Sequence, residues 1–210
     1  MNNELEFQQA RLNEIVSTYT GRPIVVVLEG RDSAGKSGTI RELTHFLPTK
    51  EFAIVTTNKP TKAQMASWLA WWSTRIPANP MITLCDRSWY SRALVQSVNG
   101  WCTPKQYHNF MGRVNDWEKE QNCLIIKFWL SISQQEQSAR LTDRKTSKLR
   151  GWKYSNNDAM ALTQYDKMSL AKENLFTATG QDWNVIDYNN KAEGRVNMIT
   201  RLCDILQQLN

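Results

Sequence analysis

Glycine and proline are scarce in this 210-residue chain, which has only 9 and 6 of them. With 41% hydrophobic and 22% charged residues, the composition excludes collagen-like, low-complexity and intrinsically disordered classes. Long hydrophobic runs are also missing, since the apolar run at residues 23–28 is far shorter than the roughly 18 residues that cross a bilayer. Residues 1–7 lack the basic and apolar stretches of a secretion signal. We therefore expect a single cytoplasmic domain over residues 1–210, without membrane contact.

Cysteine and histidine are too few and too scattered for a metal or disulfide framework. Cys85, Cys102, Cys123 and Cys203 form no C-x-x-C pair, and the chain has only two histidines. Zinc sites and disulfide scaffolds both need closer or more regular spacing. We interpret the cysteines as small buried hydrophobic residues without chemistry of their own.

Positive charge exceeds negative charge by 6 at pH 7. Most of the excess lies between residues 140 and 153. This segment has one acidic residue, Asp143, and six basic ones: Arg140, Arg144, Lys145, Lys148, Arg150 and Lys153. Such a balance favours anionic partners without identifying them. The segment is compatible with a solvated surface, a nucleic-acid contact or a mobile lid over a phosphorylated substrate.

Continuous apolar runs alternate with helical segments along the chain. The runs, at residues 24–28, 52–57, 81–85, 123–130 and 183–186, are typical of strands buried on both faces. Helix-start signals stand at Thr61, Thr103 and Ser133, and amphipathic stripes at residues 5–19, 158–178 and 196–206. We predict an α/β fold with three α/β/α layers and a parallel sheet of about five strands. The apolar terminal helices also leave room for a subunit interface.

Residues 30–37, Gly-Arg-Asp-Ser-Ala-Gly-Lys-Ser, match the phosphate-binding pattern G-x-x-x-x-G-K-[ST] between a predicted strand and a predicted helix. The glycines let backbone N–H groups converge on phosphate oxygens at a helix N-terminus. Lys36 adds a full charge, and Ser37 offers its hydroxyl to Mg²⁺. The expected cradle comprises Gly30, Arg31, Ser33, Ala34, Gly35, Lys36 and Ser37. The alternative is a glycine turn that only joins strand to helix.

Acidic and basic side chains follow the loop and the third predicted strand. Asp86 ends that strand where phosphate-loop enzymes keep a second Mg²⁺-handling acid, although such a residue can also cap the next helix. Arg87 and Arg92 would meet phosphates there. Asp32 stands among the phosphate-binding amides, where a carboxylate would hold metal or orient an attacking oxygen, unless it turns to solvent.

Four segments, read together, resemble the family-2 polyphosphate kinases. They are residues 29–40, Lys59-Pro-Thr61, Asp86-Arg-Ser-Trp-Tyr-Ser-Arg-Ala93, and Arg144 through Trp152-Lys153-x-Ser155-x-x-Asp158. The match is collinear over nearly the whole chain. The resemblance implies a phosphate-loop kinase fold with a helical lid at about residues 140–158, commonly in oligomers, here a homodimer or homotetramer.

The resemblance also implies an activity. A Mg²⁺-dependent enzyme, with Mn²⁺ as an alternative metal, would move the terminal phosphoryl group between inorganic polyphosphate and ADP or AMP, with GDP and GMP as further acceptors. Metal would be held by Asp32, Ser37 and Asp86. Catalysis would involve Asp32, Lys36, Asp86, Arg87, Arg140 and Arg144, with Lys59, Arg92 and Lys153 as further phosphate contacts. Ser37, Ser147 and Lys148 depart from the family's usual glycine, acid and proline.

Two other functions share parts of this pattern. An ATP-dependent nucleoside or nucleotide kinase would use the same loop, the Asp86 strand and the lid. A basic nucleic-acid-binding module would use the charged segment but leave the loop and Asp86 without a role. We therefore expect no nucleic-acid partner.

Overall fold

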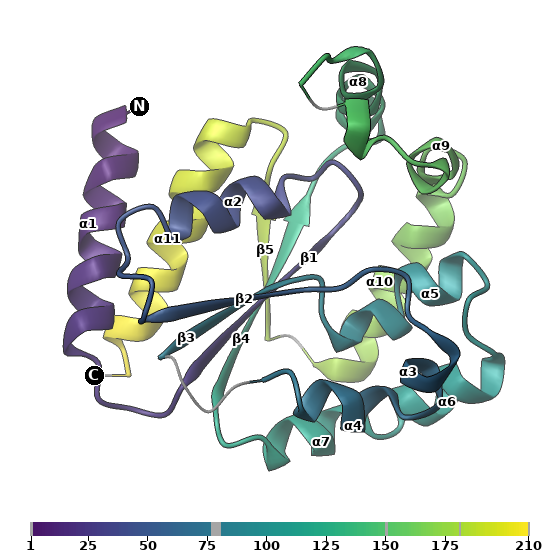
Figure 1. Ribbon diagram of the computed structural model, residues 1–210, viewed down its shortest axis with the longest axis horizontal. Coiled ribbons are helices and arrows are strands. Elements are labelled where there is room, and N and C mark those ends of the chain that lie inside the picture. Colours follow the sequence, from purple (N-terminus) through teal and green to yellow (C-terminus); the bar gives the residue numbers. More distant parts are fainter. Residues whose placement is uncertain (1, 77–80, 150, 181, 210) are drawn as a thin grey trace.

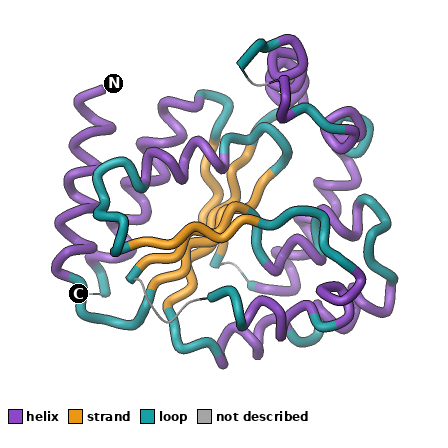
Figure 2. Tube along the Cα trace, viewed as in Figure 1, coloured by secondary structure: helices purple, strands orange, loops and turns teal. Residues whose placement is uncertain are grey.

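Five parallel strands form one sheet in the order β2-β3-β1-β4-β5 (Figures 1 and 2). The computed structural model describes residues 2–76, 81–149, 151–180 and 182–209. The strands are β1 (Ile24–Gly30), β2 (Phe52–Thr56), β3 (Ile82–Asp86), β4 (Leu124–Ser131) and β5 (Trp183–Asp187). Each lies within two residues of its predicted run, and the predicted α/β class is confirmed.

Helices cover both faces of the sheet, which makes the three predicted layers. One face carries α1 (Asn2–Thr18), α2 (Lys36–Leu43) and α11 (Lys191–Gln207) (Figure 1). The other face carries α3 (Lys62–Ala66), α4 (Trp68–Ser73), the 3₁₀ turn η1 (Trp89–Arg92), α5 (Val95–Val98), α6 (Pro104–Met111), α7 (Val114–Glu120) and α10 (Tyr165–Thr179). The remaining elements, α8 (Gln134–Thr146), η2 (Gly151–Lys153) and α9 (Asn156–Ala161), extend from the end of the molecule toward which β4 and β5 point.

The central strand β1 shows why its sequence is apolar throughout. Ile24, Val26 and Leu28 face the core beneath α1, α2 and α11. Val25 and Val27 face the second core, which is rich in tryptophan. Because successive side chains of a strand point to opposite faces, a strand between two helical layers needs apolar residues at every position.

The outer strands correct part of this prediction. Burial on both faces was expected for all five strands, yet Ile54 of β2 is 47% exposed and Val185 of β5 is 53% exposed. Both strands lie at the edges of the sheet, where the helical layers cover them incompletely. An apolar run therefore predicted the strand correctly but not its place in the sheet.

The helix predicted over residues 158–178 is wrong, because the chain forms two helices there. Thr163 donates both its N–H (3.1 Å) and its hydroxyl (2.9 Å) to the carbonyl of Met160. This tight turn closes α9 before α10 begins at Tyr165. The break lets α9 and α10 take different directions at the edge of the site.

The predicted helix starts are confirmed at Thr61 and Thr103, where both halves of a capping box are present. At Ser133 only one half forms. The Ser133 hydroxyl accepts the Glu136 N–H, but the carboxylate of Glu136 pairs instead with Arg140. The Glu136 side chain is thus diverted from its helix terminus to an arginine of the site.

The terminal helices pack on each other rather than presenting free apolar faces. Leu12 and Ile15 of α1 and Leu202 and Leu206 of α11 are buried in one core. The stripes that suggested a subunit interface are therefore used within the fold, and the oligomeric state stays a prediction. None of the described helices is long and apolar enough to cross a membrane.

Candidate active site

The loop between β1 and α2, residues 30–37, is held in a shape that requires glycine. Gly30 has φ 149°, and a Cβ there would lie 2.6 Å from the carbonyl oxygen of Leu130 on the neighbouring strand. Gly35 has φ 121°, outside the range that other residues adopt easily. This conformation places the loop before the N-terminus of α2, as the sequence predicted.

Lys36 folds back over this 30–37 loop. Its Nζ donates to the carbonyl oxygens of Gly30 (3.1 Å) and Arg31 (2.9 Å). Burial and the nearby charge of Arg87 lower the pKa of Lys36 to about 8. An anion in the loop would raise this pKa again, because it stabilises the charged form of the lysine.

Asp86 and Ser37 supply oxygen atoms where the 30–37 loop meets the end of β3. The Ser37 hydroxyl donates to Oδ2 of Asp86 at 2.5 Å. Within the described ranges, no group of three or more His, Cys, Asp or Glu side chains is arranged to hold a metal. Mg²⁺ commonly takes one or two protein oxygens and completes its shell with substrate phosphate and water. The donor set therefore fits Mg²⁺ bound together with a phosphorylated substrate.

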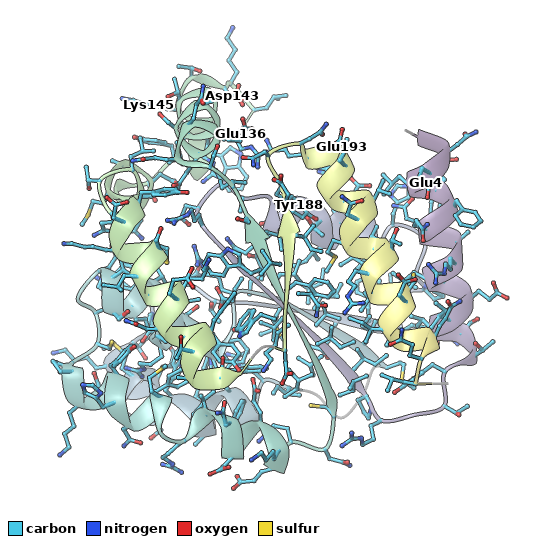
Figure 3. The ribbon with its side chains drawn as sticks, turned by 180° about the vertical axis from the view of Figure 1, so that it is seen from behind. Glu4, Glu136, Asp143, Lys145, Tyr188 and Glu193 are labelled. Atoms are coloured by element: carbon cyan, nitrogen blue, oxygen red, sulfur yellow. The ribbon has the colours of Figure 1, made fainter. Side chains whose placement is uncertain are left out.

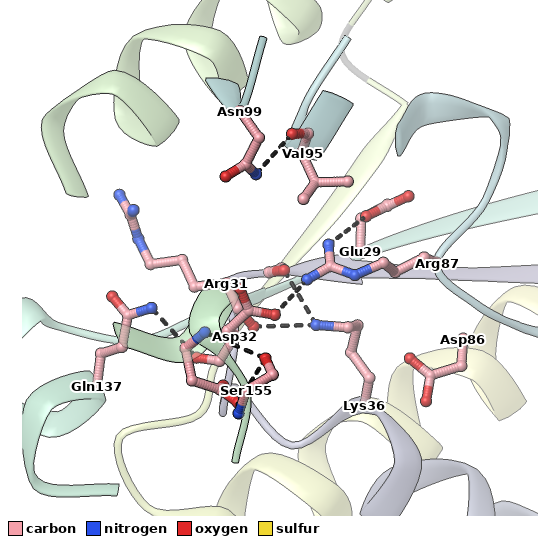
Figure 4. Close-up of polar contacts among 12 residues, drawn as sticks. Glu29, Arg31, Asp32, Lys36, Asp86, Arg87, Val95, Asn99, Gln137 and Ser155 are labelled. Atoms are coloured by element: carbon pink, nitrogen blue, oxygen red, sulfur yellow. Dashed lines mark hydrogen bonds and ion pairs between the residues drawn. The ribbon is translucent and has the colours of Figure 1, made fainter. Parts of the chain in front are cut away.

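Arg87 lies between two carboxylates (Figure 4). Its Nη2 donates to Oδ1 of Asp32 at 2.5 Å, and its Nη1 is 3.8 Å from Oε2 of Glu29. Burial alone would raise the pKa of Asp32, but the charges of Arg87 and Lys36 outweigh burial and lower it. Asp32 is therefore a carboxylate at neutral pH, and it faces the site rather than solvent.

Arg140 of α8 is buried and fully hydrogen-bonded. Its five N–H groups donate to one carboxylate and four carbonyl oxygens: Glu136 (2.6 Å), Ser33 (3.2 Å), Ala34 (3.0 Å), Tyr188 (2.5 Å) and Asn189 (3.1 Å). Glu136 and Tyr188 are labelled in Figure 3, at the base of α8 and the end of β5. In this arrangement Arg140 has no donor left for a phosphate. It joins the 30–37 loop to α8 and to the residues after β5.

Arg144 ties α8 to the start of α9. Its Nη1 donates to Oδ1 of Asp158 at 2.7 Å. The other oxygen of Asp158 accepts the N–H of Ser155 (2.9 Å) and its hydroxyl (3.2 Å), which completes a capping box. We call residues 140–158 the lid segment. The ion pair between Arg144 and Asp158 joins the α8 part of this segment to the start of α9.

Part of the lid segment is not brought to the 30–37 loop in the described part of the chain. Lys148 is exposed, and Ser147 ends α8 as its C-terminal cap. Arg150 lies outside the described residues, as does the side chain of Lys153. The phosphate-binding roles of Lys148, Arg150 and Lys153 stay predictions.

Two predicted arginines point away from the 30–37 loop. Arg31 donates to the carbonyl of Tyr165 (2.9 Å) and to the hydroxyl of Ser169 (2.6 Å), both on α10. Arg92 is buried and donates to the carbonyl of Met65 at 2.8 Å. Only the backbone of Arg31 belongs to the loop, and Arg92 is not brought together with it.

Two cavities meet at the loop. The first, about 430 Å³, is lined by the 30–37 loop, Asp86 and the lid segment, and we call it the loop cavity. The second, about 270 Å³, contains Lys59, Trp68 and Trp101 in its wall, and we call it the side cavity. Asp32, Arg87 and Arg144 line both cavities. Three charged side chains thus form the boundary between the two spaces.

Sequence reasoning missed a basic wall of the loop cavity formed by Arg41, Lys191 and Arg195. Lys191 and Arg195 lie one turn apart at the start of α11, so their spacing predicts a shared face. Arg41 lies one turn after Ser37 on α2 and carries the same signal. Glu29 was also missed, since an acid inside an apolar strand carries no signal for what it faces.

Comparisons with known proteins agree with this geometry. The family model described as Polyphosphate kinase 2 (PPK2) matches residues 1–210. An NDP-polyphosphate phosphotransferase 2 of Ruegeria pomeroyi is 36% identical over 185 residues, covering 85% of this chain and 54% of its own length. A GDP-polyphosphate phosphotransferase of Mycolicibacterium smegmatis is 35% identical over 184 residues, covering 84% of this chain and 65% of its own. The chain thus spans about half to two thirds of these relatives.

A solved structure extends the likeness to three dimensions. The crystal structure of a polyphosphate kinase 2 from Arthrobacter aurescens superposes with a TM-score of 0.88 at 27% sequence identity. The match covers 98% of this chain and 78% of that protein. Both the sheet and the elements around the site therefore have counterparts in a solved structure.

Proposed function

The chain belongs to the polyphosphate kinase 2 family, and from this premise we propose that it moves the terminal phosphoryl group between inorganic polyphosphate and a nucleoside mono- or diphosphate. ADP and AMP are the expected acceptors, with GDP and GMP as further ones. The names of the two curated relatives, which refer to NDP and GDP, support a nucleotide as the second substrate.

The observation that carries the proposal is the meeting of the two cavities at Asp32, Arg87 and Arg144. A phosphoryl transfer needs a donor and an acceptor on either side of the transferred group. The loop cavity suits polyphosphate, because seven basic and only two acidic residues line it. The side cavity suits a nucleotide, since it offers the indole groups of Trp68 and Trp101 beside polar side chains.

The residues at the boundary have distinct roles in this proposal. Lys36, Arg87 and Arg144 neutralise charge on the transferring group. In phosphoryl transfer the protein forms few covalent bonds, so this charge stabilisation supplies most of the catalysis. Asp32 orients the attacking phosphate oxygen. Asp86 and Ser37 hold Mg²⁺, or Mn²⁺ as an alternative, and the metal would screen the negative charge of the phosphate oxygens.

Arg140 contributes indirectly. Because its N–H groups bind Ser33 and Ala34 of the 30–37 loop, movement of α8 would be transmitted to the phosphate-binding backbone. We propose that the lid segment closes over the donor, with Arg144 reaching the boundary and Lys59 serving the side cavity. Closure would exclude water, which otherwise competes as an acceptor.

The test is an incubation with polyphosphate, Mg²⁺ and each nucleotide in turn, followed by separation of the products. We expect ATP or GTP to form from the diphosphate only when polyphosphate is present. Asp86→Asn, folded and with an unchanged unfolding temperature, serves as the inactive control. Phosphorylation from ATP but never from polyphosphate would instead indicate a nucleotide kinase. Binding of single-stranded nucleic acid without any transfer would indicate the binding module.

A homodimer or homotetramer is part of the same proposal. It is supported by exposed apolar side chains outside the cores, among them Phe7 (62%), Leu170 (64%) and Val185 (53%). Light scattering on the purified protein tests it, and a monomeric mass at all concentrations would contradict it.

A further inference from the structure

Glu29, the residue before Gly30 at the end of β1, is a fully buried carboxylate without an assigned role. Its Oε1 accepts the N–H and the hydroxyl of Ser88, each at 2.9 Å. Its Oε2 has no hydrogen-bond partner and lies 3.8 Å from Nη1 of Arg87, which is also buried without one. Figure 4 shows this pair with the Arg87 guanidinium pointing between Glu29 and Asp32.

Burial outweighs the neighbours of Glu29 and leaves its pKa raised, but every one of those neighbours is suited to a carboxylate. Burial raises the pKa of Glu29, and the charges of Arg87 and Lys36 and the Ser88 hydrogen bonds oppose that rise. Each of these neighbours is a donor or a cation, so a proton on Oε2 would face a guanidinium and find no acceptor. The carboxylate and the guanidinium are therefore partners in an ion pair that is about 1 Å longer than a charge-assisted hydrogen bond.

The backbone at Arg87 makes this contact more than a chance approach. Arg87 has φ 66°, a left-handed conformation that costs about 1–3 kcal/mol for a residue other than glycine. Its N–H continues the sheet by donating to the carbonyl of Leu28 (3.1 Å), and Ser88 is held by Glu29. The carboxylate of Glu29 thus binds Ser88, the residue after Arg87, and also faces the side chain of Arg87 itself.

In the proposed reaction Arg87 must contact the transferring phosphoryl group, although it is hydrogen-bonded to Asp32. Its Nη2 binds Asp32, yet Asp32 must orient an attacking oxygen and Arg87 must meet the transferring group. Without the charge of Glu29, Asp32 would be the sole carboxylate within ion-pair distance of Arg87 among the described residues. The guanidinium would then be held by Asp32 alone, and a tighter pair would leave both side chains less free to meet the substrates.

We propose that Glu29 is a positioning residue, whose charge balances that of Asp32 and keeps the Arg87 guanidinium available to the transferring phosphoryl group. The inference rests on the proposed function, because it concerns the boundary between the two cavities. In this proposal Glu29 does not contact the substrate and acts through Arg87.

The test is a double-mutant cycle between Glu29→Gln and Arg87→Ala. Glutamine keeps the size of Glu29 and an oxygen that accepts from Ser88, and it puts an uncharged amide NH2 in place of the Oε2 that faces Arg87. We expect kcat to fall about 10–100-fold in the wild-type background, with each KM changed less than about threefold, since the lost interaction matters in the transition state. In the Arg87→Ala background the same change should have almost no effect, because Glu29 acts through Arg87.

Glu118→Gln is the matched control. Its carboxylate is also largely buried, accepts from Trp89 Nε1 (2.8 Å) and Tyr90 Oη (2.6 Å) on the same segment, and pairs with Lys127 at 3.2 Å. Its partners in the described part of the chain are Trp89, Tyr90 and Lys127 rather than Arg87, so any loss of kcat should be the same factor in both backgrounds. Unfolding temperatures of all variants are measured alongside.

Each outcome decides the matter. The inference is overturned if Glu29→Gln leaves kcat unchanged, or if it lowers kcat by the same factor in the Arg87→Ala background. Glu29 would then only hold Ser88 in place. If Glu29→Gln does not fold, the cycle is repeated with Glu29→Asp, which keeps the charge but withdraws it by about one carbon–carbon bond, and the same coupling is expected. The cycle uses whichever donor the wild-type protein accepts, so failure with polyphosphate alone contradicts the proposed function and not the role of Glu29. A wild-type protein that transfers from no donor overturns both.

Discussion

Replacing Arg140 with methionine tests whether this residue holds the 30–37 loop or binds phosphate. Methionine has an apolar side chain without N–H groups that ends near the position of the arginine Nε, so it keeps the packing of the stem and removes all five hydrogen bonds. Two of the carbonyl oxygens that lose their donor, those of Ala34 and Tyr188, belong to buried hydrogen bonds. The other acceptors, including Glu136, are partly exposed, so water can replace Arg140 there.

The expected loss of stability follows from these two buried carbonyls. A buried acceptor that loses its partner costs about 1–3 kcal/mol, so the two together give about 2–6 kcal/mol. For a chain of this length, each kcal/mol lowers the unfolding temperature by about 3 °C. We therefore expect Arg140→Met to lower it by roughly 6–18 °C.

Thermal unfolding followed by circular dichroism, without ligands, measures this quantity. Arg144→Met is the matched control on the same helix, since Arg144 is 25% exposed at its side chain and forms an ion pair with Asp158. The control breaks one hydrogen bond to a buried carboxylate and should lose about 1.5–3 kcal/mol, and yet lose at least about tenfold in turnover. If Arg140→Met unfolds within 2 °C of the wild-type protein but has lost turnover, Arg140 binds phosphate and the loop-holding role is refuted.

Three further predictions concern the loop cavity. Asp86→Asn should lower turnover at least about a hundredfold and weaken the dependence on Mg²⁺ without a change in unfolding temperature; wild-type rates across a Mg²⁺ titration would contradict the metal assignment. Lys36, with its pKa of about 8, is protonated below that pH and loses its charge above it, so kcat/KM for polyphosphate should fall as pH rises through about 8; a flat profile to pH 9.5 would count against this. Arg195→Gln should raise KM for long polyphosphate more than for short oligomers and flatten its dependence on salt; equal changes for both chain lengths would place Arg195 outside the polymer path.

Much of the fold was predictable because parallel strands covered on both faces are apolar throughout. Residues 24–28, and residues 123–130 apart from Lys127, are such runs, and they became β1 and β4 in the interior of the sheet. The edge position of β2 and β5 was not predictable in the same way. Their sequences are also apolar, and exposure at an edge depends on which helices cover the sheet, a property of the assembled layers rather than of the strand.

The break between α9 and α10 shows a second limit. An apolar stripe continues through residues 158–178, and no glycine or proline interrupts it. The turn depends on local hydrogen bonds from Thr163 to Met160, which compete with the helix in one arrangement of the chain. Periodicity records which residues share a face, and it does not record whether the backbone between them is continuous.

The charged residues of the site set the sharpest limit, since a sequence shows where a cation stands in the chain but not how many of its donors are free. Arg140 and Arg144 are one helical turn apart and look equivalent in the sequence. In the fold, Arg140 reaches four carbonyl oxygens because the 30–37 loop and the end of β5 converge beneath it, whereas Arg144 pairs with Asp158 and lines both cavities. An arginine whose five N–H groups are all bound within the protein stabilises the binding loop, and one with donors left over can respond to a ligand. The division of labour between the two residues therefore follows from long-range contacts between elements more than 40 residues apart, which helical spacing cannot reveal.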